Sequence, residues 1–346
     1  MFSKLRPLIF KLEPELAHNL AIKALKLNYI PPFKQENNEL LKTNIFGKNI
    51  ANPIGMAAGF DKNAEVYNSL FKLGYGFVEV GTVTPLKQYG NLKPRMFRLE
   101  EDKALINRLG FNNSGAKKIS SRIRNNPPKS LLGINIGPNK DTTNRISDYL
   151  IGLRTFYNLA DYLTINISSP NTENLRSFHN QQELENLISA IDKEKKVLKT
   201  NIPIVIKISP DIRDNQIDEI AQIFLNYKIS AIIISNTTEN NRSNLINSNK
   251  YQKGGLSGKP LEQKSNLLIN KFYKILKGKI IIIGVGGVDS GKSIYEKLLC
   301  GANLIQLYTG MIYEGPNIVN KIINELNIIL KKEEINNLNS IIGSKS

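Results

Sequence analysis

The chain has 346 residues, 41% of them hydrophobic, and a formal net charge of +17, which is enough sequence for one large domain with an appendage. Its only cysteine is Cys300 and its only histidines are His18 and His179, so an intrachain disulfide and a cysteine- or histidine-rich metal site are excluded and no metal is expected. The basic residues are scattered and no nucleic-acid motif accompanies them, so we expect no nucleic-acid partner.

Residues 1–30 predict two short amphipathic helices. One face of each helix is apolar: Phe2, Leu5, Ile9 and Leu12 in the first, Leu16, Leu20, Ala24 and Leu27 in the second. Flanking lysines and arginines make this pattern typical of an interfacial membrane anchor, although a helical hairpin packed on its own domain fits equally well. No apolar run approaches the roughly 20 residues that a membrane span needs, and no signal-peptide core is present.

Domain boundaries follow from composition. Pro31, Pro32 and the polar run 34–39 indicate a linker. We therefore expect an N-terminal helical extension at residues 1–38, a main domain at 39–335 and a disordered tail at 336–346.

From about residue 50, short apolar runs alternate with helical patterns. The expected strands are 54–57, 77–80, 132–136, 162–165, 204–208, 231–235, 280–285 and 304–307. Clear helical patterns cover 184–198, 216–227, 267–276 and 293–299. Eight such units predict a (β/α)8 barrel, an α/β fold. A doubly wound open sheet is the alternative, disfavoured because no Gly-x-Gly-x-x-Gly follows the first strand.

Carboxamides recur where these strands end, and in a barrel those ends share the face that carries the chemistry. They are Asn107, Asn135, Asn166, Asn171 and Asn236. Each offers a planar donor and acceptor, which suits a heterocycle with alternating N–H and C=O groups. In an Asn-rich chain one such residue is unremarkable, but five at successive strand ends favour a binding site.

Cations and glycines complete the predicted site. Lys62 and Lys207 lie in the barrel mouth, where a positive charge suits a flavin that accepts electrons. Gly286 and Gly287 after the seventh strand, with Thr309 after the eighth, indicate phosphate binding. The strand-end motifs hold no carboxylate pair, histidine or cysteine, so glycosidase and triad-hydrolase chemistry are unsupported.

Together these motifs resemble the dihydroorotate dehydrogenase family, in its membrane-associated, quinone-dependent class. The similarity runs from Glu13 to Pro316, with segments 57–62, 106–112, 166–172 and 283–287 in the family's order. The resemblance implies FMN-dependent oxidation of (S)-dihydroorotate to orotate in pyrimidine (UMP) biosynthesis, with ubiquinone or menaquinone as acceptor. It further implies a monomer held peripherally on the cytoplasmic face of the inner (cell) membrane.

The resemblance also assigns residues. FMN contacts would come from Ala57, Ala58, Gly59, Phe60, Asp61, Lys62, Thr82, Asn135, Asn166, Lys207, Ser235, Gly258, Gly286, Gly287, Tyr308 and Thr309. Dihydroorotate would be held by Lys62, Asn107, Arg108, Leu109, Gly110, Phe111, Asn166, Asn171, Asn236 and Thr237. The inner end of a quinone tunnel would be lined by His18, Arg98 and Tyr308.

Ser169 would be the catalytic base, taking the C5 proton while hydride leaves C6 for flavin N5. A serine is a poor base near neutral pH, so we expect a water or Thr82 to relay the proton. The cytosolic class of the family uses cysteine there, so Ser169 indicates the quinone class. Two small departures are Ser235, where threonine is common, and Phe60, where leucine is more usual.

Two rival interpretations remain at this point. A tRNA dihydrouridine synthase, another FMN barrel, would explain the basic charge but normally needs a cysteine in its active loop. A non-catalytic phosphate-binding barrel would keep the glycines without the need for Lys62, Ser169 and Lys207 together.

Overall fold

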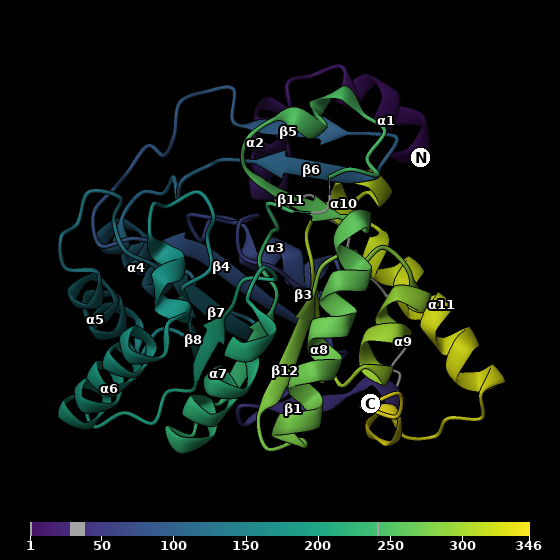
Figure 1. Cartoon of the computed structure of the whole chain (residues 1–346). Coiled ribbons are helices and arrows are strands. Elements are labelled where there is room, and N and C mark those ends of the chain that lie inside the picture. Colours follow the sequence, from purple (N-terminus) through teal and green to yellow (C-terminus); the bar gives the residue numbers. More distant parts are fainter. Residues whose placement is uncertain (1, 28–38, 241) are drawn as a thin grey trace.

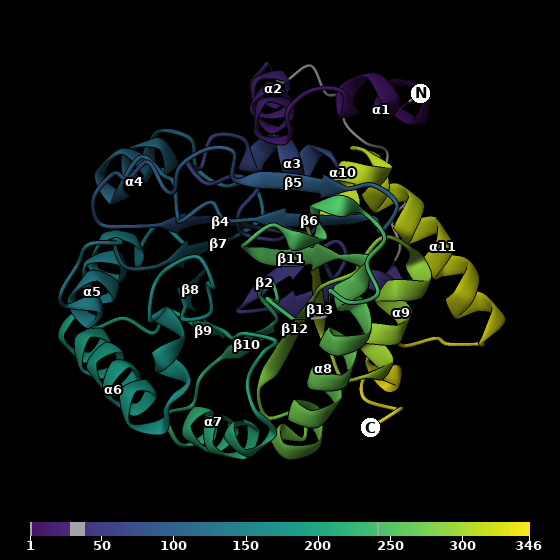
Figure 2. The same ribbon diagram turned by 45° about the horizontal axis from the view of Figure 1, so that its top comes forward.

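A closed barrel of eight parallel strands forms the centre of the computed structural model, which describes residues 2–27, 39–240 and 242–346 (Figures 1 and 2). The strands are β3 (Ile54–Met56), β4 (Phe77–Val83), β7 (Leu131–Ile136), β8 (Tyr162–Asn166), β9 (Ile204–Lys207), β10 (Ala231–Ile234), β12 (Ile281–Val285) and β13 (Leu304–Leu307). Each pairs with the next, and β13 closes the ring against β3. The predicted (β/α)8 barrel is confirmed, and with it all eight strands.

Helices surround the barrel because each carries one apolar face. They are α3 (Tyr67–Lys72), α4 (Ala116–Asn125), α5 (Arg145–Phe156), α6 (Gln181–Val197), α7 (Asp214–Asn226), α8 (Glu262–Leu276), α9 (Gly291–Leu299), α10 (Thr309–Glu314) and α11 (Ile318–Lys332). In α7, for example, Ile217, Ile220, Ala221 and Phe224 are buried at helical spacing while the opposite face is polar. The four predicted helices are confirmed as parts of α6, α7, α8 and α9.

A short hairpin, β1 (Thr43–Ile45) and β2 (Lys48–Ile50), lies at the opposite end of the barrel from the predicted site (Figure 1). Its Ile45 and Ile50 join a buried apolar cluster with Phe77 and Tyr162 of the barrel interior. The Phe46 ring packs against the Tyr162 ring at 5.3 Å between centroids. This end of the barrel is therefore sealed by apolar side chains.

The other end is covered by a three-stranded antiparallel sheet, the upper sheet, which the sequence patterns did not predict. It contains β5 (Met96–Leu99) and β6 (Ala104–Asn107) from the segment after β4, and β11 (Gly255–Gly258) from the segment after β10. Figure 2 shows this sheet between the barrel mouth and the N-terminal helices. Short 3₁₀ turns complete the elements: Glu39–Leu41, Leu175–His179, Ser248–Tyr251, Lys259–Leu261 and Leu338–Ile341.

The two predicted N-terminal helices are α1 (Phe2–Phe10) and α2 (Pro14–Lys26). The Glu13 carboxylate caps α2 by accepting from the amides of Glu15 and Leu16. Two buried arginines of the segment 94–99 attach the helices to the upper sheet. Arg95 makes a bidentate ion pair with Glu15, and Arg98 donates to the Phe10 and Leu12 carbonyls between the helices.

The predicted linker, with Pro31 and Pro32, lies outside the described residues, so the boundary at residue 38 stays a prediction. No helix among the described residues has the length and apolar character that a bilayer crossing requires.

The expectation of a disordered tail at 336–346 is wrong. Residues Leu338–Ile341 form a 3₁₀ turn whose Leu338 and Ile341 side chains are buried. The Tyr273 hydroxyl donates to the Ile342 carbonyl, and the Gly343 amide donates to the Leu298 carbonyl. Two apolar residues three positions apart are too short a pattern to predict from sequence, yet they suffice to dock this segment on α8 and α9.

Candidate active site

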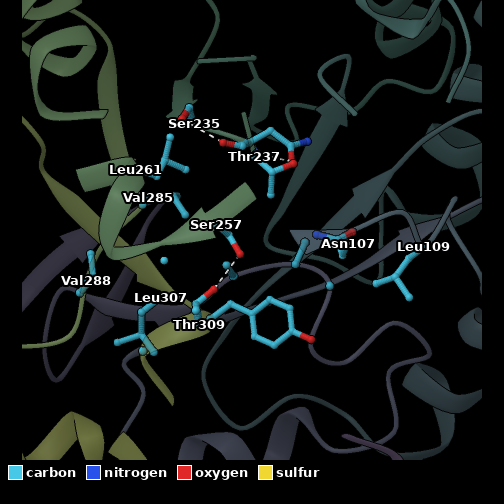
Figure 3. Close-up of a pocket in the computed structure, with 18 of the residues that line it drawn as sticks. Asn107, Leu109, Ser235, Thr237, Ser257, Leu261, Val285, Val288, Leu307 and Thr309 are labelled. Atoms are coloured by element: carbon cyan, nitrogen blue, oxygen red, sulfur yellow. Dashed lines mark hydrogen bonds between the residues drawn. The ribbon is translucent and has the colours of Figure 1, made fainter. Parts of the chain in front are cut away.

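A cavity opens at the carboxyl ends of the barrel strands, beneath the upper sheet. Figure 3 shows Asn107 and Leu109 on one side of it and Val285 and Val288 on the other. It brings together most of the residues predicted from sequence: Ala57, Ala58, Gly59, Lys62, Thr82, Asn107, Leu109, Gly110, Phe111, Asn166, Ser169, Asn171, Lys207, Ser235, Asn236, Thr237, Gly258, Gly286, Gly287, Tyr308 and Thr309. Residues far apart in sequence therefore share one concave site.

Glycines and hydroxyls form one end of this cavity. Gly287 has φ +75°, and a Cβ there would lie 2.3 Å from the Glu262 Cβ, so only glycine fits. The Ser257 and Thr309 hydroxyls lie 2.9 Å apart and point toward one another (Figure 3). Uncovered backbone amides beside hydroxyls are a chemistry that suits a phosphate group.

Two lysines bring positive charge to the cavity. Lys62 donates to the Gly59 carbonyl at 2.7 Å, and burial lowers its pKa to about 8, a shift that Glu15 opposes. Lys207 at the end of β9 is almost fully buried. Burial lowers the pKa of Lys207 as well, while the charge of Glu79 acts in the opposite direction. Both amines lack a direct carboxylate partner within 4 Å among the described residues, which leaves them available to an anionic or electron-rich ligand.

A chain of polar side chains runs across the cavity floor. The Thr82 hydroxyl donates to Asn135 Oδ1 at 2.6 Å, and the Asn166 amide donates to Thr82 Oγ1 at 2.9 Å. The Asn236 amide donates to Ser168 Oγ at 2.9 Å. No hydrogen bond joins Thr82 to Ser169 in the described structure, so a relay of the proton through Thr82 stays a prediction.

Ser169 lies in the loop after β8, where its hydroxyl oxygen accepts the Asn171 amide at 3.2 Å. The Asn171 side chain reaches Asn107 across the cavity at 3.4 Å. Arg176 holds this loop in place, since its guanidinium donates to the Ser168 carbonyl and to the Thr237 carbonyl of the loop after β10. The serine is thus 5% exposed and fixed against the residues predicted to hold the substrate.

A second, smaller polar cavity lies between α2 and the barrel, lined by His18, Phe60 and Lys62 among others. Three aromatic rings lie beside it, since His18 and Tyr308 both pack edge-on against Phe60, at 5.2 and 5.9 Å between centroids, and Lys62 lines both this cavity and the main one. Burial, helped by the charge of Lys62, lowers the pKa of His18 to about 3, so the ring is neutral at ordinary pH. The N-terminal helices therefore connect to the main site through a neutral aromatic contact.

Several predicted residues lie outside the main cavity. The Arg108 side chain turns away from it, stacking on the Phe97 ring at 4.6 Å and donating to the Pro94 and Lys253 carbonyls. Asp61 is buried and caps the turn before α3 through the Glu65 and Val66 amides. Burial raises the pKa of Asp61.

Asn135 lies just below the cavity, fully buried. Arg98 fixes the turn between α1 and α2 and stacks on the Phe10 ring at 4.7 Å, and its place in a quinone tunnel stays a prediction.

The cavity also contains residues that sequence reasoning did not select, among them Ser257, Leu261, Val285 and Tyr313. The Tyr313 hydroxyl lies 2.8 Å from the Ala104 carbonyl and 3.1 Å from the Leu99 carbonyl in the unpredicted upper sheet, so its one proton is shared between them. Only the Gly-rich context of Ser257 was visible in the sequence.

Comparisons with known proteins agree with this geometry. The family described as "Dihydroorotate dehydrogenase" matches residues 40–330. The chain is 45% identical over 338 residues to a dihydroorotate dehydrogenase (quinone) of Bartonella tribocorum, covering 96% of this chain and 93% of the relative. The corresponding protein of Rhizobium meliloti is 43% identical over 341 residues, covering 97% of this chain and 94% of the relative.

Solved structures give the same result. The crystal structure of the Eimeria tenella protein in complex with ferulenol superposes with a TM-score of 0.92 at 36% identity, covering 96% of this chain and 95% of that one. Its ligand-free form also gives 0.92, at 37% identity, covering 96% and 99%. The chain belongs to the dihydroorotate dehydrogenase family and, within it, to the quinone-dependent oxidoreductases.

Proposed function

We propose that the protein oxidises (S)-dihydroorotate to orotate with FMN as its cofactor and a quinone, ubiquinone or menaquinone, as electron acceptor, in pyrimidine biosynthesis. One observation carries the proposal: Ser169 lies in the same cavity as Lys62 and the carboxamides of Asn107, Asn171 and Asn236. A carboxylate-bearing pyrimidine needs both a cation and planar donor–acceptor groups, and this cavity supplies them around a single candidate base.

The residues present fit FMN. Gly258, Gly286, Gly287 and Thr309 provide the phosphate end, and Lys207 and Asn166 lie at the base of the cavity. The Tyr308 hydroxyl is buried without a hydrogen-bond partner among the described residues, which suits a polar ligand atom beside it. When bound, FMN supplies the acceptor for the hydride that leaves substrate C6.

The protein's own contribution is to orient the substrate and to take its C5 proton. Lys62 pairs with the substrate carboxylate, and Asn107, Asn171 and Asn236 bind the pyrimidine edge. Ser169 Oγ removes the proton, and the low exposure of its loop keeps bulk water from competing. Because no hydrogen bond joins Thr82 to Ser169 among the described residues, an ordered water is the better candidate for carrying the proton onward.

The quinone and the membrane meet the protein at α1 and α2. The apolar faces of these helices are exposed rather than packed, as Leu5 (45%) and Leu20 (45%) show, and Leu8 beside the first face is 62% exposed. Exposed Leu86, Tyr89 and Leu92 extend the same end of the molecule, where Arg95 holds their loop through the Tyr89 and Asn91 carbonyls. Apolar groups among lysines and arginines suit an anionic bilayer surface. These exposed groups support a peripheral membrane contact; the cytoplasmic face of the cell membrane and the monomeric state are proposed from the family resemblance alone.

The test is anaerobic mixing of the purified protein with dihydroorotate while the absorbance of the bound flavin is followed. If ubiquinone reverses the bleaching and fumarate does not, the result supports the flavin, the substrate and the quinone acceptor together. Reversal by fumarate would keep the substrate and overturn the acceptor. A bound flavin that dihydroorotate fails to bleach would overturn the substrate.

The structure argues against the first rival interpretation, and the purified protein tests the second. A dihydrouridine synthase needs a cysteine in its active loop, but Cys300 follows α9 and does not line the cavity, and burial raises the pKa of its thiol. A non-catalytic phosphate-binding barrel would purify without flavin.

A further inference from the structure

A buried carboxylate lies inside the barrel, below the cavity floor. Glu79 sits in the apolar strand β4 and has no exposed surface. Its oxygens accept four hydrogen bonds: from Asn135 at 2.8 Å, Tyr162 at 3.1 Å, Thr164 at 3.0 Å and Gln306 at 3.0 Å. All four partners donate, which is what an ionised carboxylate requires.

Burying this carboxylate costs folding free energy, because a buried charge loses its hydration. In the described structure, no lysine or arginine nitrogen lies within 4 Å of Glu79. Burial and the nearby charge of Glu79 raise the pKa of Tyr162 well above its ordinary value, so its hydroxyl remains a donor. The carboxylate is held by neutral groups from β7, β8 and β13.

Glu79 fixes the direction of the polar chain above it. Because the carboxylate can only accept, Asn135 must turn its NH₂ group down and its carbonyl oxygen up. That oxygen then accepts from Thr82 at 2.6 Å and from the Asn166 NH₂ at 3.2 Å. Asn166 in turn presents its own oxygen to the Asn236 NH₂, at 3.4 Å. One carboxylate thus determines how the carboxamides of Asn135 and Asn166 are oriented, and through Asn166 it bears on Asn236.

Glu79 also balances the charge of the site. Lys207 is paired in register with Asn166 on the neighbouring strand and lines the cavity, whereas Glu79 lies below it. Burial lowers the pKa of Lys207, and the negative charge of Glu79 opposes this shift and favours the charged lysine. The barrel therefore holds an anion beneath a cation, both shielded from water by the apolar seal at the far end.

We propose that Glu79 is a positioning residue that orients the Asn135–Thr82–Asn166 chain toward FMN and, with Lys207, sets the charge beneath it. This inference rests on the proposed function, since it requires FMN in the main cavity. Reduction adds negative charge to a flavin, so a buried anion below it makes reduction less favourable.

The test compares Glu79→Gln, which removes the charge and keeps the shape, with Glu79→Asp, which keeps the charge and shortens the reach. Two quantities are measured without any dihydroorotate: the FMN dissociation constant of the apoprotein, and the midpoint potential against a reference dye. For Glu79→Gln we expect a less negative potential and roughly 10-fold weaker FMN binding. For Glu79→Asp we expect the wild-type potential and similarly weakened binding.

Tyr162→Phe is the matched control, because it removes one hydrogen bond to Glu79 and leaves the charge. Its potential should equal that of the wild type. An equal shift in Tyr162→Phe and Glu79→Gln would overturn the charge role, as would an unchanged potential in Glu79→Gln. Wild-type FMN affinity in Glu79→Asp would overturn the orienting role, even if Glu79→Gln failed to fold. A wild-type protein that binds no FMN would instead overturn the proposed function itself.

Discussion

Ser169 is held more firmly than a residue in an ordinary turn. Pro170 restricts its backbone, Asn171 donates to its hydroxyl, and Arg176 fixes the preceding carbonyl. A base held this way has little rotational freedom, which favours proton abstraction at one position of a bound substrate. The nearby Lys62 provides the other residue-scale contribution, a charge whose ionisation lies close to working pH.

Replacing Ser169 by alanine should leave FMN binding intact and lower the rate of flavin reduction by dihydroorotate about 100-fold or more, because general-base catalysis contributes on that order. Anaerobic stopped-flow measurement of the flavin absorbance reports the rate. Ser177→Ala, whose hydroxyl contacts Glu183 on the outside of the same region, is the control and should retain wild-type rates. A near-wild-type rate for Ser169→Ala across the pH range would remove the serine from the reaction.

The affinity for orotate should fall as pH rises through about 8, the pKa to which burial lowers Lys62. A lysine is charged below its pKa, so the cation that pairs with the substrate carboxylate is progressively lost above it, by about tenfold in affinity per pH unit. Titration of the flavin spectrum with orotate from pH 6 to 10 measures this. In Lys62→Arg the charge persists and the profile should be flat; the same inflection in that variant would assign the titration to another group.

At the scale of elements, the sequence patterns predict the barrel well because the barrel strands are short and mostly apolar, as strands buried on both faces require. The upper sheet escapes prediction because β5, β6 and β11 are short and mix arginine, asparagine, serine and glycine with apolar residues. Their pairing depends on segments distant in sequence. The upper sheet matters for the site because Arg95 and Arg98 attach α1 and α2 to it.

The structure brings the predicted site residues into the cavity where they end a barrel strand, as Asn166 and Lys207 do. Arg108 was predicted to hold the substrate because its neighbours Asn107 and Leu109 face the cavity, but just after the end of β6 its own side chain turns the other way, onto the Phe97 ring. Glu79 was missed because an acid within an apolar run carries no strand-end signal, and its partners Tyr162 and Gln306 come from other strands.

The exposed face of α1 and α2 can be tested without removing the helices, which would leave Arg95 buried without Glu15. Leu8→Ser together with Leu20→Ser should weaken binding to anionic phospholipid vesicles roughly tenfold, because two leucine contacts with lipid are lost. Quinone reduction should fall with it, while flavin reduction by dihydroorotate stays unchanged. Vesicle co-sedimentation and the two half-reactions measure these effects.

Ile328→Ser, on α11, alters an equally exposed apolar residue (69%) outside this surface and serves as the control. If the double variant binds vesicles as well as the control does, α1 and α2 are not the docking surface.

For the molecule as a whole, the two histidines determine part of the pH dependence of stability. Burial lowers the pKa of His179 to about 4, and the pKa of His18 lies at about 3. His179 accepts the Ser209 amide at Nε2, and its Nδ1 lies 2.9 Å from the Arg176 carbonyl. A proton on Nε2 would break the first of these hydrogen bonds, so the folded protein disfavours the charged form.

The free energy of unfolding should therefore decrease as pH falls below about 6.5, the ordinary pKa of histidine. Below that pH the two histidines bind protons in the unfolded chain but stay neutral in the folded protein. For His179 the loss is about 2 kcal/mol at pH 5 relative to pH 8. Urea unfolding at the two pH values measures it. The glutamine in His179→Gln can preserve both hydrogen bonds without titrating. The drop in unfolding free energy from pH 8 to pH 5 should therefore be about 2 kcal/mol smaller in this variant than in the wild type. An identical pH dependence would contradict the assignment.

The upper sheet has a consequence for how the molecule is made. β6 and β11 are joined across a large part of the chain, as shown by the hydrogen bond between Ser257 and Leu105, which are 152 positions apart. Contacts of such long range form late, after the intervening strands have brought their ends together. Closure of the barrel is longer-ranged still, because β13 pairs with β3 through Ile305 and Ile54. A nascent chain therefore completes its cofactor pocket only after β13 has been made, since Tyr308 and Thr309 line that pocket as well.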